Sequence, residues 1–194
     1  MKNIAFVCIA VVVAAGAVAL SGSASGHSGD EATPVVAPIY VVRIPPGYRD
    51  WRLISVARVG DPLNDLRAKL GNDIAIKAYR EGKLPFPDGT IIARLAWQQA
   101  TSETIQNAFR VRGGTETHLS PEQVEKLVDG SFVAGPRTNL QLMVKDSTKY
   151  ASTGGWGFAQ FNDGKPADEA THKTCFSCHE PAKDRDYVFT SYAP

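Results

Sequence analysis

The segment Cys175-Phe176-Ser177-Cys178-His179, near the end of a chain of 194 residues, constrains this protein more than any other feature of its sequence. Two thiols three residues apart on a helical turn can each bond one vinyl group of a porphyrin, and C-x-x-C-H is the attachment signature of a c-type haem. The adjacent His179 can then present its imidazole to the iron as the proximal ligand. The motif therefore predicts one covalent haem c, held by Cys175 and Cys178, with His179 as the metal ligand.

Two other uses of the thiols are a redox-active disulfide and half of a zinc site. Zinc would need two more ligands at suitable spacing, yet the chain has no second C-x-x-C, and His172 is only one candidate. A thioredoxin-like motif should open a helix after a strand in a βαβ pattern, whereas this one lies near the C-terminus. Both alternatives fit the sequence less well than a haem does.

The N-terminus has the pattern of an export signal. One positive charge within Met1–Asn3 precedes an unbroken apolar run, Ile4 to Leu20, and small residues follow at once. This order is typical of a cleavable signal peptide, although an uncleaved membrane anchor stays open because the run reaches the lower edge of a bilayer span. We expect a signal peptide over residues 1–25, a flexible leader over 26–43, one domain over 44–194, and a periplasmic location.

Charge and cysteine content narrow the function classes. The chain has 21 Lys and Arg, 20 Asp and Glu, and three cysteines. Loss of the signal peptide removes Lys2 and Cys8, which leaves a neutral domain whose two cysteines both belong to the motif. A neutral domain argues against nucleic-acid binding and against strong long-range steering of a redox partner. Two cysteines also exclude a disulfide-rich scaffold.

Residue patterns predict an α+β domain, an antiparallel sheet with short segregated helices. In the range Thr90 to Gln99, alternation places Ile92, Arg94, Ala96 and Gln98 on one face of a strand. Ser120-Pro121-Glu122-Gln123 is a capping box that predicts a helix. Further strands are expected over 51–59, 66–70, 140–144 and 156–161, and helices over 74–81 (capped by Asp73), 121–129 and 168–183, the last carrying the haem motif.

The second axial position of the iron decides the function. An electron-transfer cytochrome often fills it with Met or His. Outside the signal peptide the chain has one methionine, Met143, within an apolar strand pattern that favours the core. His27 and His118 are expected to be exposed, and His172 lies on the proximal element. We therefore expect a five-coordinate iron with an open distal site, with a six-coordinate electron-transfer centre as the alternative.

Five blocks, in this order, resemble the cytochrome P-460 family. They are Tyr48-Arg49-Asp50-Trp51, Pro87-Asp88-Gly89-Thr90, Val144-Lys145-Asp146-Ser147, Gly155-Trp156-Gly157-Phe158, and the haem motif followed by Asp186-Tyr187-Val188-Phe189-Thr190. The resemblance covers roughly residues 44–192. It implies a periplasmic mono-haem protein with an antiparallel sheet, usually a homodimer, whose electrons leave to a soluble redox partner. Family members oxidise hydroxylamine, and the related cytochromes c′-beta bind nitric oxide or other small gases.

The resemblance also implies distal residues. The family's enzymes cross-link a strand lysine to the haem rim, but here the matching position is Arg94, and no lysine occurs between Lys83 and Lys126. A distal arginine matches Arg67, and an acidic distal residue falls at Gln141, which cannot act as a carboxylate base. Without the resemblance, all three could belong to a solvated strand face. Two hypotheses follow, oxidation of hydroxylamine or reversible binding of nitric oxide without turnover.

Overall fold

The computed structural model describes residues 40–193, apart from Val42 and Thr117. All the described residues belong to one compact unit. The predicted signal peptide, most of the leader and His27 lie outside the described residues. Within the described part of the chain, no helix is both long and apolar enough to cross a membrane.

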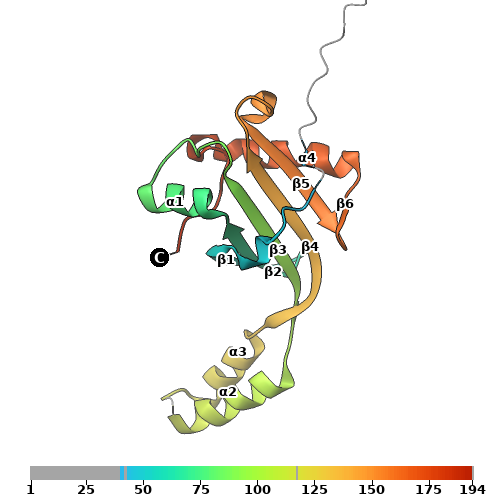
Figure 1. Cartoon of the computed structure of the whole chain (residues 1–194). Coiled ribbons are helices and arrows are strands. Elements are labelled where there is room, and N and C mark those ends of the chain that lie inside the picture. The colour runs from blue at the N-terminus through green and yellow to red at the C-terminus, as the bar shows by residue number, and fades with distance from the viewer. Residues whose placement is uncertain (1–39, 42, 117, 194) are drawn as a thin grey trace, which may run out of the picture. The chain divides into compact units, whose positions relative to one another are not determined.

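Six antiparallel strands form one sheet in which neighbours in sequence are neighbours in space (Figure 1). The strands are β1 (Arg52–Val59), β2 (Asp65–Gly71), β3 (Ile91–Ala100), β4 (Val133–Lys145), β5 (Trp156–Asn162) and β6 (Lys165–Pro166). Antiparallel strands that are neighbours in sequence can be joined by short turns. The helices of this chain are therefore not needed to connect the strands. The predicted antiparallel α+β fold is therefore confirmed.

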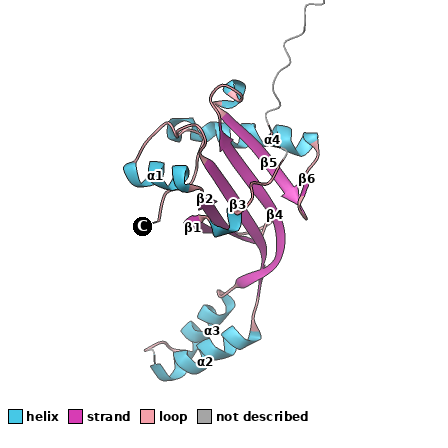
Figure 2. Ribbon diagram, in the orientation of Figure 1, coloured by secondary structure: helices cyan, strands magenta, loops and turns pink. Residues whose placement is uncertain are grey.

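The α-helices interrupt the meander at two connections and follow it after the last strand, as Figure 2 shows by colour. Helix α1 (Asp73–Glu81) joins β2 to β3, and α2 (Glu103–Glu116) with α3 (Pro121–Asp129) joins β3 to β4. Helix α4 (Glu169–His179) follows β6. Short 3-10 segments are η1 (Tyr48–Asp50), η2 (Ala151–Thr153) and η3 (Glu180–Arg185).

The predicted helix signals mostly hold, with one correction at a cap. At α3 the Ser120 hydroxyl accepts from the Gln123 amide, and the Ser120 amide donates to the Gln123 side chain, which is a complete capping box. Helix α1 is capped by Asn72 and not by Asp73. The Asn72 Oδ1 accepts from the amides of Ala75 (3.0 Å) and Ile91 (3.1 Å), so one side chain ties the start of α1 to the start of β3.

The two faces of the sheet bury different clusters. The first, called the α4 face here, packs against α1, α4 and the C-terminal segment; its buried members include Ile54, Ile76, Ile92, Met143, Trp156, Phe158 and Val188. The opposite face buries Tyr48, Ala93, Leu140, Leu142, Ala159 and Phe161 under residues before β1. Because side chains alternate along β3, Arg94 lies on the same face as Ile92, as predicted.

The folded chain already includes residues within the predicted leader. The Val41 amide donates to the Phe158 carbonyl at 2.8 Å. The Tyr40 ring stacks on His172 with centroids 4.9 Å apart. Tyr40 and Val41 therefore pack against α4 and β5.

Candidate haem site

Helix α4 gathers the three residues of the haem motif at its C-terminal end. Asp168 caps the helix, since its carboxylate accepts from the Thr171 amide at 2.8 Å. Cys175 and Cys178 are one helical turn apart, and His179 is four residues after Cys175, so all three occupy one side of the helix. Cys175 is half-buried against the α4-face cluster and Cys178 is exposed, and neither forms a disulfide. Burial, with a smaller contribution from Cys178, raises the pKa of the Cys175 thiol.

The imidazole of His179 is oriented as a metal ligand requires. Its Nδ1 lies 2.8 Å from the carbonyl oxygen of Tyr187. A carbonyl only accepts, so Nδ1 carries the hydrogen and Nε2 keeps its lone pair. Burial lowers the pKa of His179, partly offset by the bond to Tyr187, and this favours the neutral form that coordinates metals. The ring also contacts Phe158 and Phe189, with centroids 5.0 and 5.2 Å away.

A buried ion pair anchors the turn that presents the Tyr187 carbonyl. Asp186 and Tyr187 both have left-handed backbone angles, φ 52° and 64°, which non-glycine residues rarely adopt. The Asp186 carboxylate accepts from Lys145 Nζ at 2.7 and 3.0 Å and from the Phe86 amide at 2.8 Å. Lys145 also donates to the Gly154 carbonyl at 2.9 Å. The ion pair therefore fixes the carbonyl group that orients the His179 ring.

Gly154 is required by the same turn. A Cβ atom at this position would lie 2.1 Å from Cε2 of Tyr187, and its φ of +66° is unfavourable for other residues. Gly154 thus allows the Tyr187 ring to pack closely against the backbone.

The predicted distal residues lie together on the α4 face. In the strand register Arg94 on β3 is opposite Gln141 on β4, and Arg67 on β2 is diagonal to Arg94 because it pairs with Ala96. Arg67 forms a bidentate pair with Asp65, with distances of 2.8 and 3.1 Å. The Gln141 amide donates to Gln160 at 2.8 Å. All three are partly buried, so a fully solvated strand face does not describe them.

Arg94 is the predicted distal residue with an unused hydrogen-bond donor. One terminal nitrogen donates to Asn139, but the buried Nε–H has no hydrogen-bond partner among the described residues. Burial, and secondarily the charge of Arg67, lowers the pKa of Arg94 to about 10, while Asp65 acts in the opposite direction. An unpaired, desolvated donor of this kind is poised for an acceptor from outside the chain.

Lys69 is a site residue that sequence patterns did not identify. It lies on β2, on the α4 face, directly opposite Arg94 in the register. Burial first, then the charges of Arg67 and Arg94, lowers its pKa. The alternation of Asp65, Arg67 and Lys69 on one strand was the available signal, but only strand pairing shows that the β3 position occupied by Arg94 has a lysine beside it.

A comparison with protein-family models shows the family to which the chain belongs. The family model Cytochrome P460 matches residues 45–190, which is most of the chain. The chain belongs to the cytochrome P460 family. Membership implies a haem cofactor, and with it iron, in agreement with the motif on α4. No curated protein matches the chain.

The residues described above fit the group that cytochrome P460 membership implies. Two free thiols, a neutral imidazole with an available Nε2, and the rings of Phe158 and Phe189 lie together at one end of α4. Among the described residues no three His, Cys, Asp or Glu side chains form a metal-binding group, so zinc finds no further ligands near the thiols there. Attachment through Cys175 and Cys178 stays a prediction.

Met143 and His172, which were weighed as a second axial ligand, are engaged elsewhere. Met143 is buried in the α4-face cluster with Ile92 and Phe158, which agrees with a core role. His172 is 1% exposed, and its Nε2 lies 3.0 Å from the Gln160 amide. His118 is exposed and precedes α3.

The large aromatic residues on and beside the strands divide between the two faces of the sheet. Phe158 contacts His179, and Trp156 is fully buried beneath Lys145, 5.0 Å from its Nζ to the ring centroid. Trp51 and Phe161 pack on the opposite face, and Trp97 alternates onto that face too. Core packing therefore describes most of them, and Phe158 contacts His179.

Proposed function

We propose that this member of the cytochrome P460 family is an exported c-type cytochrome that binds a small nitrogen ligand, such as nitric oxide or hydroxylamine, at an open distal position. Cys175 and Cys178 would anchor the haem, and His179 would be the proximal ligand. The observation that carries the proposal is that Met143 and His172, the best-placed candidates for a second axial ligand, are fixed in the core and in a hydrogen bond to β5. The haem supplies an iron that coordinates the ligand and exchanges electrons.

The chain's own residues account for selectivity at the distal side. The unpartnered Nε–H of Arg94 can donate to a ligand oxygen. Arg67 and Lys69 add positive potential on the same face, and this favours ligands that develop negative charge. Gln141, bonded to Gln160, can hydrogen-bond but cannot take up a proton at neutral pH. Such an arrangement supports binding and polarisation of a small nitrogen oxide.

Oxidation of hydroxylamine is the second candidate, and Lys69 favours it. This oxidation releases protons together with electrons, so a base is needed beside the ligand. The family resemblance implies a carboxylate at position 141, but this chain has Gln141 there. Lys69 is a half-buried amine whose pKa is lowered. In this scheme Lys69 in its neutral form, which the lowered pKa favours, accepts a proton, and a soluble redox partner accepts the electrons. The apolar N-terminal run supports export to the periplasm, and the family resemblance supports a homodimer.

A spectrum of the ferrous holoprotein tests the open distal position. We expect a high-spin, five-coordinate spectrum that changes on addition of nitric oxide. Met143→Leu serves as the matched control, because it keeps the buried volume and removes the sulfur. A low-spin spectrum in the parent protein that becomes high-spin in Met143→Leu would show methionine ligation and defeat the proposal.

Anaerobic incubation with hydroxylamine and an electron acceptor then separates the two candidates. Turnover that is lost in Lys69→Gln but kept in Lys149→Gln, an exposed control, would support oxidation. Reversible binding without consumption of hydroxylamine would support the binding function alone.

A further inference from the structure

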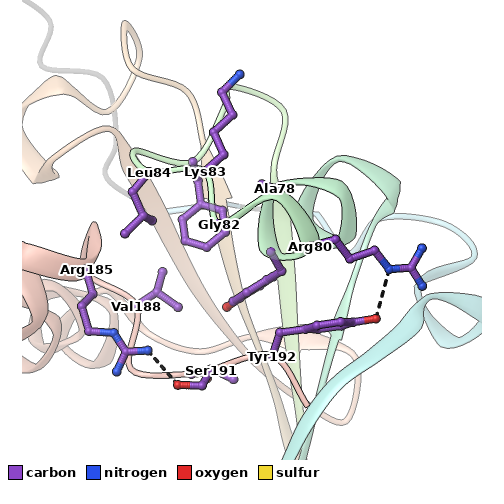
Figure 3. Close-up of a pocket in the computed structure, with 12 residues that line it drawn as sticks. Ala78, Arg80, Gly82, Lys83, Leu84, Arg185, Val188, Ser191 and Tyr192 are labelled. Atoms are coloured by element: carbon purple, nitrogen blue, oxygen red, sulfur yellow. Dashed lines mark hydrogen bonds between the residues drawn. The ribbon is translucent and has the colours of Figure 1, made fainter. Parts of the chain in front are cut away.

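A cavity lies between the C-terminal end of α1 and the segment that follows η3 (Figure 3). Its volume is about 490 Å³, within the range of small-molecule sites. None of Cys175, Cys178, His179, Arg67, Arg94 or Gln141 lines it, so it is distinct from the haem-site residues. The proposed function leaves this cavity without a role.

The lining combines apolar rings with positive charge. Tyr79, Phe86, Val188 and Tyr192 supply apolar surface, whereas the ionisable groups at the rim are cationic: Arg80, Lys83 and Arg185. No Asp or Glu lines the cavity. Three cations without a facing carboxylate favour an anionic occupant and disfavour a cation.

The two arginines are held in place and keep donors for a ligand. Arg80 Nε donates to the Tyr192 hydroxyl at 3.3 Å, and Arg185 donates through one terminal nitrogen to the Ser191 hydroxyl at 2.9 Å (Figure 3). Each guanidinium has five N–H groups, so these bonds orient the fork without using it up. A planar fork fixed on one side is suited to bind a carboxylate on the other.

The Tyr79 hydroxyl is the second, independent sign of a ligand. It is buried and has no hydrogen-bond partner among the described residues. Burial raises the pKa of Tyr79, so the phenol stays protonated and acts as a donor. Buried donors without an acceptor are rare in native proteins because the desolvation goes uncompensated. Its ring meets Phe86 edge-on, with centroids 4.9 Å apart, and stacks with Tyr192 at 6.0 Å.

We propose that this cavity binds a small aromatic carboxylate. Its ring packs against Phe86 and Tyr192, and its carboxylate accepts from the Tyr79 hydroxyl and from Arg80 or Arg185. The apolar rings account for the aromatic body, and the unpaired donor with the cationic rim accounts for the anionic end. Haem chemistry is not required for this binding, so the proposal stands or falls independently of the proposed function.

Fluorescence titration of the holoprotein with 2-naphthoate tests the site, with neutral 2-naphthamide as the matched probe. We expect saturable binding of one naphthoate per chain and binding of naphthamide weaker by about tenfold or more, as loss of a charge-assisted bond implies. Arg185→Gln should weaken naphthoate about tenfold, and Tyr79→Phe several-fold. Lys77→Gln is the control, since Lys77 lies on α1, pairs with Glu81 and does not line the cavity.

Three results would overturn the proposal. They are absence of saturable binding, equal affinity for the acid and the amide, and equal weakening by Lys77→Gln and Arg185→Gln, which would show general attraction to a basic surface. The haem spectrum of each variant reports whether it folds. Arg185 is exposed, so Arg185→Gln keeps the test valid even if Tyr79→Phe fails to fold.

Discussion

Replacement of Asp186 by Asn isolates the role of the buried ion pair behind the proximal histidine. The side chains of Lys145 and Asp186 are 6% and 9% exposed, and Lys145 Nζ lies 2.7 Å from the carboxylate. Asn keeps the size of Asp and can still accept from the Phe86 amide. It removes the negative charge, however, and leaves the Lys145 ammonium buried against Trp156 and the Gly154 carbonyl.

The expected cost follows from that burial. Removal of one partner from a buried ion pair destabilises a protein by about 3–5 kcal/mol, because the remaining charge loses its compensation. Glu169→Gln provides a control on α4, since the Lys173–Glu169 pair is 68% and 63% exposed. Exposed pairs contribute about 0–1 kcal/mol. Urea unfolding of the holoprotein, followed by circular dichroism, measures both differences.

A spectroscopic measurement distinguishes positioning from stability alone. If Asp186 holds the turn that carries the Tyr187 carbonyl, Asp186→Asn loosens the hydrogen bond from His179 Nδ1 and makes the imidazole a weaker donor to iron. The iron–histidine stretching frequency should fall and the reduction potential should rise. The reasoning is refuted if Asp186→Asn is no less stable than Glu169→Gln, or if it is less stable while frequency and potential stay unchanged.

Three further predictions concern the same helix and turn. Cys175→Ala with Cys178→Ala should abolish haem that survives denaturing mass spectrometry; in the parent, peptide mapping should find haem on these two cysteines, and an adduct on Lys69 would contradict us. Asp168→Ala should lower the urea midpoint near neutral pH by removing the cap of α4. Because hydrogen bonds from Thr171 lower the pKa of Asp168, this stabilisation should persist above the ordinary carboxyl pKa and disappear as pH falls through the lowered one; a difference that persists in strong acid would argue against the cap. Gly154→Ala should destabilise the fold by roughly 2 kcal/mol or more, since its Cβ meets the Tyr187 ring, and an unchanged melting temperature would be the contrary result.

Local signals in the sequence predicted local structure well. The capping box at Ser120 and the alternation around Arg94 act within a few residues, and both α3 and the face of β3 are as expected. The cap of α1 was assigned to Asp73 because Asp and Asn are both good caps and stand side by side. Only the backbone shows that Asn72 has the extended conformation of a cap, and that its oxygen also receives the Ile91 amide.

Features that depend on partners distant in sequence could not be predicted. Helix α2 has weak amphipathic periodicity and includes Gly113, and it is joined to α3 by the Arg110–Glu125 ion pair, 3.1 Å long. Lys69 was visible as a strand residue, but its place beside Arg94 depends on the β2–β3 register. Secondary-structure patterns do not show how strands and helices pair with one another. They therefore predict neither the packing of α2 against α3 nor the position of Lys69 beside Arg94.

The blocks that carry the family resemblance meet in space, although the sequence separates them widely. Asp88 accepts from the Ser147 amide and hydroxyl at 2.8 and 2.7 Å, which joins the turn before β3 to the end of β4. Lys145 in the same block binds Asp186, 41 residues later, and Gly154 makes room for Tyr187. Together these contacts support one acceptor, the Tyr187 carbonyl, and through it the orientation of His179.

This convergence explains why family membership predicts the haem better than it predicts the reaction. The blocks that carry the resemblance meet around the Tyr187 carbonyl, which orients His179, the predicted proximal ligand. Reactivity depends on the distal side, and there the residues belong to single strand positions that can change without disturbing Lys145 or Asp186. Arg94 and Gln141, where the resemblance implies a lysine and an acid, are such positions, and Lys69 places an amine beside them from another strand. The chemistry of this protein must therefore be tested with variants of Arg94, Gln141 and Lys69. A variant of Lys145 or Asp186 would instead change how His179 is held.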